Sequence, residues 1–223
     1  MNWERLQADT VACDRCARLR DHCRRVAEVK RASYRDQEYW ARPVPNFGDP
    51  ASPILMVGLA PGAHGSNRTG RMFTGDGSGD FLYRALHAVG LCNRPWAVGL
   101  DDGLKLNGIA ITAVARCAPP GNKPNAEELA NCRPYFERTA DLMPNLKLFF
   151  ALGKIAFDET VRLARLRGWL DAKATFAHDS AIELTDGRWL LGCYHPSQQN
   201  TFTGRLTPEM MVRVLLRAIR LAG

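Results

Sequence analysis

The sequence has no apolar run that approaches the roughly 20 residues that a membrane-spanning helix needs. It also has no stretch typical of a secretory signal, because the first five residues lead directly into polar sequence. These absences predict a cytoplasmic protein with no membrane partner. Internal repeats and low-complexity tracts are missing as well, so a single domain covering residues 1–223 is the simplest organisation.

The cysteine count argues against a disulfide framework, because seven is odd and cytoplasmic proteins keep their thiols reduced. Cys13 and Cys16 have metal-ligand spacing, and Cys117 and Cys132 complete a candidate set of four thiolates. Spacing alone fits Zn²⁺ or an iron–sulfur cluster, and a scatter of structural thiols is the third interpretation. Such a site would tie residues 1–50 to the middle of the chain, and we expect it to be structural. The remaining cysteines are interpreted as ordinary residues: Cys23, Cys92 and Cys193.

Apolar and amphipathic runs alternate along the chain, and 46% of the residues are hydrophobic, enough for a substantial core. Strands that alternate with helices predict an α/β fold with a parallel, doubly wound sheet. The predicted strands are residues 54–57, 108–114, 146–153 and 189–193. The predicted helices are a basic segment at 10–31 and segments at 79–89, from 126 through Cys132, 155–166 and 207–221, with Asn125 and Thr207 as N-caps.

A long glycine-rich loop, residues 58–76, lies between the first predicted strand and a helix. Ligands of parallel sheets bind at the carboxyl ends of strands, and glycines let the backbone approach a ligand closely. Polar and aromatic side chains stand among these glycines: His64, Asn67, Arg68, Phe73 and Asp76. The loop lacks the Gly-Lys-Ser/Thr ending of a Walker loop and the spacing of a dinucleotide fingerprint. It therefore predicts a ligand site without identifying the ligand.

The formal charge of +7 attracts polyanions, although many basic proteins bind none. Arginines are frequent in the segment 10–31. They suit contacts to phosphate groups, and they equally suit a solvated helix face. Charge alone leaves both interpretations open.

Three segments together resemble the family 5 (type b) uracil-DNA glycosylases: residues 58–65 with 70–76, residues 116–124, and residues 195–204. The cysteine set also resembles the [4Fe-4S] ligands of that family and of the related family 4. The resemblance covers roughly residues 13–210. It implies a three-layer α/β/α sandwich with a central, mostly parallel four-stranded sheet and an active site at the carboxyl ends of the strands. It also favours an iron–sulfur cluster over zinc.

The resemblance implies a monofunctional DNA repair enzyme that extrudes uracil and related deaminated or modified bases and hydrolyses the N-glycosidic bond. Its partners would be uracil-containing DNA, single- or double-stranded, and the abasic product, and it would act as a monomer near the nucleoid of a prokaryotic cell. Lys123 is the only lysine in the three segments and has no evident apolar pocket, which argues against a Schiff-base lyase. The alternatives are a non-catalytic protein that binds damaged DNA or abasic sites, and an iron–sulfur redox protein.

Three residues are candidates for catalysis. Asp76 would stabilise positive charge on the sugar and position water, and His195 would stabilise negative charge on the uracil. Asn122 would recognise the base or position water. Each has a simpler interpretation: Asp76 as a helix cap, His195 as a loop brace and Asn122 as a turn residue. Phe73 offers a stacking face. The other candidate substrate-binding residues are Gly58, Ala60, Pro61, Gly62, His64 and Ser197.

Family 1 glycosylases have Gly-Gln-Asp-Pro-Tyr-His where this chain has Gly-Leu-Ala-Pro-Gly-Ala-His at 58–64. Ala60 replaces the water-activating Asp, and Gly62 replaces the Tyr that excludes the methyl group of thymine. We therefore expect a roomier pocket that tolerates 5-substituted uracils. The segment after His195 resembles the loop that enters the minor groove in this superfamily. The candidate DNA contacts are Arg68, Gln199, Phe202, Arg205 and Leu206.

Overall fold

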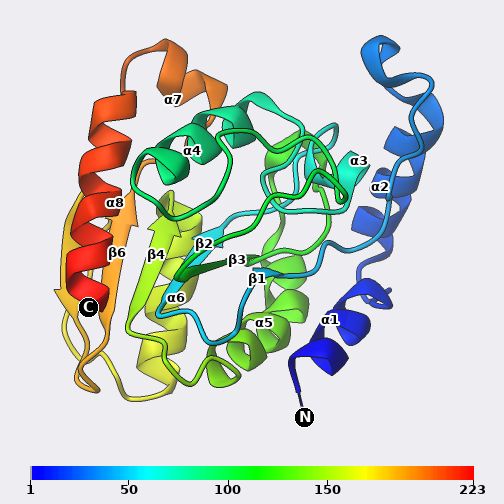
Figure 1. Cartoon of the computed structure of the whole chain (residues 1–223). Coiled ribbons are helices and arrows are strands. Elements are labelled where there is room, and N and C mark those ends of the chain that lie inside the picture. The colour runs from blue at the N-terminus through cyan, green and yellow to red at the C-terminus, as the bar shows by residue number, and fades with distance from the viewer. Residues whose placement is uncertain (1) are drawn as a thin grey trace.

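In a computed structural model that describes residues 2–223, the chain forms a six-stranded sheet with helices on both faces (Figure 1). Four central strands are parallel to one another, which confirms the predicted α/β class and its layers. In the order in which they pair, these strands are β3 (Ile109–Ala113), β2 (Ile54–Gly58), β4 (Leu148–Leu152) and β6 (Trp189–Cys193).

Two edge strands were not predicted. β1 (Phe47–Gly48) pairs antiparallel with β3, and β5 (Ser180–Glu183) pairs antiparallel with β6. A buried parallel strand is a continuous apolar run, and neither edge strand has that pattern, because β1 is two residues long and β5 is partly exposed. The predicted four-stranded sheet is therefore correct for the four parallel strands, but it omits the two edge strands of the six-stranded sheet.

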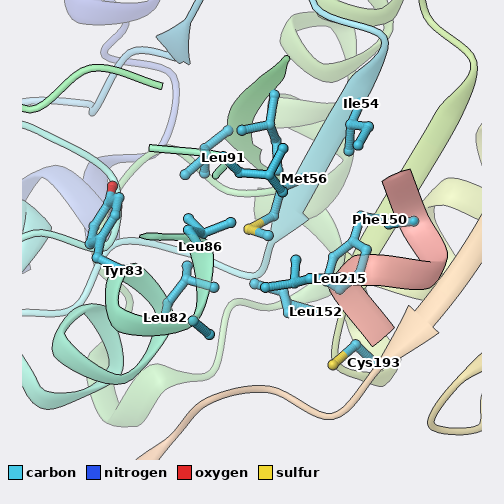
Figure 2. Packing of buried hydrophobic residues seen from close by; sticks show 14 of the residues in the cluster. Ile54, Met56, Leu82, Tyr83, Leu86, Leu91, Phe150, Leu152, Cys193 and Leu215 are labelled. Atoms are coloured by element: carbon cyan, nitrogen blue, oxygen red, sulfur yellow. The ribbon is translucent and has the colours of Figure 1, made fainter. Parts of the chain in front are cut away.

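Alternate side chains of the central strands enter two separate cores, as the period of a strand requires. Ile54 and Met56 of β2 belong to one core and Leu55 and Val57 to the other. Figure 2 shows the first core, in which side chains of the sheet meet those of two covering helices. Those helices are α4 (Gly77–Ala88) and α8 (Pro208–Ala222). The opposite face is covered by α5 (Ala126–Asp141) and α6 (Lys154–Leu166).

The N-terminal segment is two helices, α1 (Trp3–Val11) and α2 (Ala17–Val29), and not the single helical segment predicted at 10–31. Cys13 lies in the break between them, and Cys16 is the N-cap of α2. α1 packs against α5, so the break lies beside the middle of the chain. The remaining helices are single turns or little more: η1 (Ala32–Tyr34), α3 (Ser66–Thr69), η2 (Pro120–Asn122) and α7 (Gln198–Phe202).

Helix caps fix where the loops of the site begin and end. The side chain of Asn125 accepts the backbone N–H of Glu128 in a capping box, and Thr207 accepts that of Met210. Both caps were predicted. The loops after β2 and after β6 both begin at the carboxyl ends of the parallel strands. They meet where Gly77 faces Gln198 at the start of α7.

Candidate active site and cysteine cluster

The carboxylate of Asp76 lies in the bend of the glycine-rich loop. A Cβ atom at Gly62 would lie 2.8 Å from Asp76 Oδ2, and one at Gly65 would overlap it. The loop therefore requires glycine at both positions to make room for the carboxylate. The space that Gly62 leaves is occupied by Asp76, which revises the inference that this glycine enlarges a base pocket.

Asp76 is also the N-cap of α4, because its Oδ1 accepts the N–H of Gly79 at 3.0 Å. Asp76 is therefore a helix cap, as the simpler interpretation held. The cap involves only Oδ1, and Oδ2 faces Gly62 and Gly65. Burial raises the pKa of Asp76, although N–H groups of Gly79 and Ser78 oppose that shift. A desolvated carboxylate is a more effective counter-charge than an exposed one.

Phe73 and His195 bring the first and third segments together. Their ring centroids are 5.8 Å apart, with an interplanar angle of 35°. Phe73 has a φ of +52°, and its ring packs on Gly58, where a Cβ atom would lie 3.1 Å from it. Such a left-handed backbone costs a non-glycine residue about 1–3 kcal/mol and is frequent at functional sites. Burial lowers the pKa of His195 to about 4, so its ring is neutral at pH 7.

A cleft of about 320 Å³ borders His195 at the carboxyl ends of the parallel strands. Its wall includes the N-terminus of α6, which adds a partial positive charge. Tyr194 lies beside it, and the guanidinium of Arg205 stands 4.5 Å from the centroid of the Tyr194 ring. His178 stacks on the same ring at 4.9 Å and accepts the backbone N–H of Tyr194. The cleft therefore combines an aromatic wall with cationic groups, which suits a base and its phosphate groups.

The segment between η1 and β1 braces the glycine-rich loop, and the sequence analysis missed this role. The Tyr39 hydroxyl is 3.0 Å from Nδ1 of His64. The backbone N–H groups of Trp40 and Ala41 donate to carbonyl groups of the loop. The indole of Trp40 lies where a side chain at Gly70 would stand. The signal in the sequence was the run of aromatic residues among prolines, but nothing in that run indicated its partner.

The structure corrects the assignment of Arg68 as a DNA contact. Its side chain is 8% exposed and donates to the carbonyl oxygens of His64 and Gly75 at 2.8 and 2.7 Å. Its guanidinium also stands 3.9 Å from the centroid of the Tyr34 ring. Arg68 is therefore an internal brace of the loop that carries His64 and Asp76.

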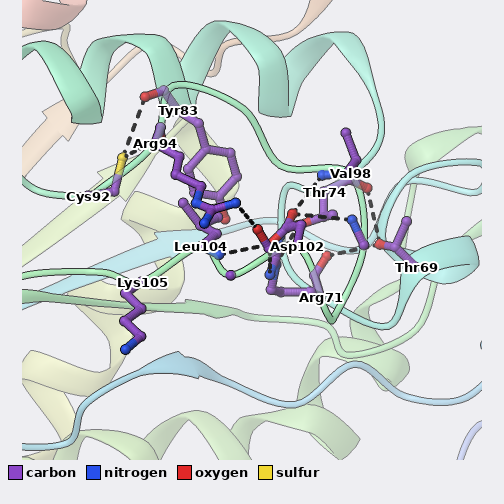
Figure 3. A network of polar contacts seen from close by, with 12 residues as sticks. Thr69, Arg71, Thr74, Tyr83, Cys92, Arg94, Val98, Asp102, Leu104 and Lys105 are labelled. Carbon is purple, nitrogen blue, oxygen red and sulfur yellow. Dashed lines mark hydrogen bonds and ion pairs between the residues drawn. The ribbon is translucent and has the colours of Figure 1, made fainter.

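A second brace of the glycine-rich loop is the carboxylate of Asp102, which lies outside the three segments. Arg71 donates to Thr74 Oγ1 at 3.0 Å and to both carboxylate oxygens of Asp102, and each partner of this ion pair is only 5% exposed (Figure 3). Asp102 also accepts three backbone N–H groups, from Val98, Gly99 and Leu104. The loop at 98–104 and the Phe73 turn are thus held by one buried carboxylate.

The loop after β6 contains α7, which Ser197 caps by accepting the N–H of Asn200. Phe202 at the end of this helix is 81% exposed, an unusual exposure for an aromatic side chain. Gln199 and Arg205 are also exposed. Leu206 is only 1% exposed and belongs to the first core, which corrects its assignment as a DNA contact.

Other predicted site residues lie at the same edge of the sheet with varied exposure. Asn122 is exposed and has a left-handed backbone with φ +57°, and within residues 2–223 its side chain has no hydrogen-bond partner. Pro61 is buried at the start of the glycine-rich loop, and Ala60 is partly exposed.

The four predicted ligand cysteines lie within electrostatic reach of one another. Burial raises the pKa of Cys16, and charge on Cys117 and Cys13 raises it further. Burial likewise raises the pKa of Cys132, with contributions from Cys117 and Cys16. Within residues 2–223, no group of three or more His, Cys, Asp or Glu side chains is placed to hold a metal ion.

Each of these four sulfur atoms has a hydrogen-bond donor beside it. The Asn131 amide donates to Cys16 at 3.6 Å, and the backbone N–H of Arg116 lies beside Cys132. The Tyr135 hydroxyl lies beside Cys13, and the Arg20 guanidinium lies beside Cys117. The other three thiols instead donate to backbone carbonyl groups, as neutral thiols do: Cys23, Cys92 and Cys193. The first set is surrounded as thiolate ligands are, and Cys23 borders it, because it packs beside Cys117 and is hydrogen-bonded to it.

Comparisons with known proteins match nearly the whole chain. A family model described as the uracil DNA glycosylase superfamily matches residues 45–218. The chain is 49% identical to the type-5 uracil-DNA glycosylase of Thermus thermophilus over the full length of both proteins. It is 49% identical to that of Mycobacterium tuberculosis, covering 98% of this chain and 81% of the relative, and 40% identical to that of Pyrobaculum aerophilum, covering 96% and 90%. In the described part of the chain, no helix is both long and apolar enough to span a membrane.

Proposed function

Because the chain belongs to the uracil DNA glycosylase superfamily, we propose that it is a repair enzyme that removes uracil from DNA and leaves an abasic site. The observation that carries this proposal is the contact of Phe73 with His195 from two loops at one edge of the sheet, with the Asp76 carboxylate buried in the bend of the loop that carries Phe73. Uracil and related deaminated bases, in single- or double-stranded DNA, are the proposed substrates, and a monomer contains the whole site.

Binding requires the base to leave the duplex, because its glycosidic bond is out of reach inside the stack. In the proposed complex, the extruded uracil stacks on Phe73, and backbone N–H groups of the glycine-rich loop meet its carbonyl oxygens. His195 donates an N–H to the O2 atom of the base. A neutral imidazole suits this role, because negative charge develops on O2 only as the bond breaks.

Cleavage leaves the bonding electron pair on the uracil and positive charge on the sugar. The Asp76 carboxylate stabilises that positive charge, and a water held by Oδ2 adds to C1′, with its proton passing to the carboxylate and then to solvent. Two opposite unit charges about 4 Å apart interact by about 4 kcal/mol at an effective dielectric constant near 20. That energy corresponds to about three powers of ten in rate.

The space left by the flipped base would be filled by Phe202, since it is exposed and Leu206 is buried in the core. Arg205, held on Tyr194, would contact a phosphate beside the base. Asp76 occupies the space beside Gly62, but the loop carries no tyrosine ring at this position that would exclude a substituent at C5 of the base. We therefore expect comparable release of uracil and 5-hydroxymethyluracil, and rejection of every 5-substituted uracil would contradict this view.

The cysteine set fits a [4Fe-4S] cluster better than a zinc ion. Ligands of one zinc ion converge on a single point, whereas the four sulfur ligands of a cluster each bind a different iron and stand further apart. Donors beside all four sulfur atoms support thiolate ligation. Cys13, Cys16, Cys117 and Cys132 would hold the cluster. It would join the N-terminal helices to the segment after β3, and we assign it no step of the reaction.

The direct test uses oligonucleotides with one uracil opposite G, opposite A or in a single strand, followed by alkaline cleavage at abasic sites. Strand breaks at the uracil position, absent with thymine there, are expected. Binding to these oligonucleotides without base release at stoichiometric protein would favour a non-catalytic damage-binding protein. Efficient trapping of the protein on DNA by borohydride would contradict a monofunctional enzyme.

A further inference from the structure

Arg116 is a cation buried without a carboxylate partner. It is 1% exposed, and its NH2 atom donates to Thr139 Oγ1 at 3.1 Å. Its Nε and NH1 atoms are buried, and within residues 2–223 they have no hydrogen-bond partner. A buried guanidinium with unpaired donors is costly to remove from water, so a charged partner is expected.

Arg20 on α2 is in the same situation on the other side of the cysteine set. It is 8% exposed, and its buried NH1 has no partner within the described residues. Neither arginine forms an ion pair with a carboxylate in the part of the chain that the structure describes. Arg71, which is just as buried, has the full carboxylate of Asp102. Arg68, which is also buried, has no carboxylate partner among the described residues but donates to the carbonyl oxygens of His64 and Gly75. Arg20 and Arg116 differ from both, because each keeps buried donors that have no partner there.

The ionisable groups around these two arginines are cysteines and one tyrosine. The charge of Arg116 acts on Cys132 and Tyr135, and that of Arg20 acts on Cys117 and Cys23. Arg20 also lines one hollow together with Cys13. Cationic groups placed beside ligand sulfur atoms are one of the means by which a protein adjusts an iron–sulfur cluster.

We propose that Arg20 and Arg116 are the buried counter-charges of the [4Fe-4S] cluster. This inference rests on the cofactor proposed above. An oxidised cubane core with four thiolates is a dianion, so two guanidinium groups balance it. The reduced cluster carries one more negative charge, so the two arginines stabilise it further and raise the reduction potential. They also slow the loss of iron, because an apo site leaves both cations uncompensated.

The test uses the cluster-loaded protein, prepared without oxygen, and its Arg116→Met and Arg20→Met variants. The readouts are iron and acid-labile sulfide per chain, the rate of iron transfer to a chelator, and the midpoint potential from an electron paramagnetic resonance titration. Arg116→Lys restores a positive charge without the planar fork. Arg188→Met is the matched control, because Arg188 is a half-buried arginine paired with Asp186 in the β5–β6 hairpin.

Each Met variant is expected to lower the equilibrium constant for reduction of the cluster at least tenfold. This corresponds to a midpoint potential about 59 mV lower for a one-electron couple. Iron release should quicken in both, Arg116→Lys should recover part of each effect, and Arg188→Met should match the wild type. Should Arg116→Met not fold, Arg20→Met carries the test. Unchanged potential and iron release in a loaded Met variant would overturn the inference. Wild-type protein that contains no iron or sulfide would contradict the proposed cofactor. Uracil excision is measured in a separate assay, so that result would leave the proposed glycosylase activity untouched.

Discussion

Replacing Asp102 with asparagine should destabilise the protein by about 3–5 kcal/mol, the usual cost of removing one partner of a buried ion pair. The variant keeps the size of the side chain, but one of the two oxygens that accept backbone N–H groups becomes an NH2 donor. It leaves the Arg71 guanidinium without a counter-charge in a site where both side chains are 5% exposed. The brace also holds Thr74, next to Phe73, so the position of the stacking ring is expected to loosen.

The assay combines denaturant unfolding of the loaded protein with the kcat/KM of uracil release. A second variant, Arg71→Met with Asp102→Asn, removes both charges, and it should recover much of the lost stability because no unpaired charge remains. Asp186→Asn is the matched control. It breaks the partly exposed pair with Arg188 and should cost at most about 1 kcal/mol.

The same pair determines a response to acid. Burial alone would raise the pKa of Asp102. The hydrogen bonds from Arg71 and from three backbone N–H groups outweigh it and hold the pKa well below its usual range. A lowered folded-state pKa adds stability above the unfolded value of about 3.9, and this is lost as the pH falls toward the folded one. The wild type should therefore lose more stability below about pH 4 than Asp102→Asn does. Equal stabilities of Asp102→Asn and wild type at pH 7, or a double variant as unstable as the sum of the singles, would refute this reasoning.

Further predictions concern the site and the cluster. Asp76→Ala should lower kcat by about three powers of ten, because it removes the charge interaction described above. Asp76→Asn should lower kcat by a similar factor if the carboxylate acts through its charge. Activity retained by Asp76→Asn would exclude this role of the charge. In the wild type, kcat should fall as acid protonates Asp76, whose pKa burial raises. A rate independent of pH down to pH 4 would argue against the role of this carboxylate. Phe202→Ala should weaken duplex binding at least tenfold, in line with about 1–3 kcal/mol for an aromatic contact to a base, and unchanged affinity would exclude it as the wedge. Cys132→Ser should lose iron and Cys92→Ser should not, since only the first is surrounded by donors, and equal iron contents would contradict the ligand set.

The parallel centre of the fold was predictable because each central strand is a short apolar run, and several of the helices between and after these strands begin with a clear cap. Asn125 and Thr207 show this well, since their side chains cap the helices that they were expected to begin. The edge strands were not predictable in this way. β1 exists only because β3 offers it an unpaired edge, and two residues carry no period of their own.

The candidate site was predictable only as far as its chemistry lies in local motifs. Asp76, Phe73 and His195 stand in such motifs, and the fold brings them together. The braces were not predictable, because Asp102 and Tyr39 lie far along the chain from the residues they hold. Exposure was not predictable either. Two long or apolar side chains in suitable segments, Arg68 and Leu206, are buried, since the sequence does not reveal which side of a loop faces the core.

The central claim is that Asp76 and its neighbours form a catalytic site and not only a binding site. It is tested most directly by measuring free uracil released from one duplex, together with the affinity for that duplex, for the wild type and for Asp76→Ala. The account predicts that the wild type releases uracil in repeated turnovers, and that the variant binds with similar affinity but releases it about a thousandfold more slowly. Tight binding by the wild type with no free uracil, or equal release rates for the two proteins, would contradict it.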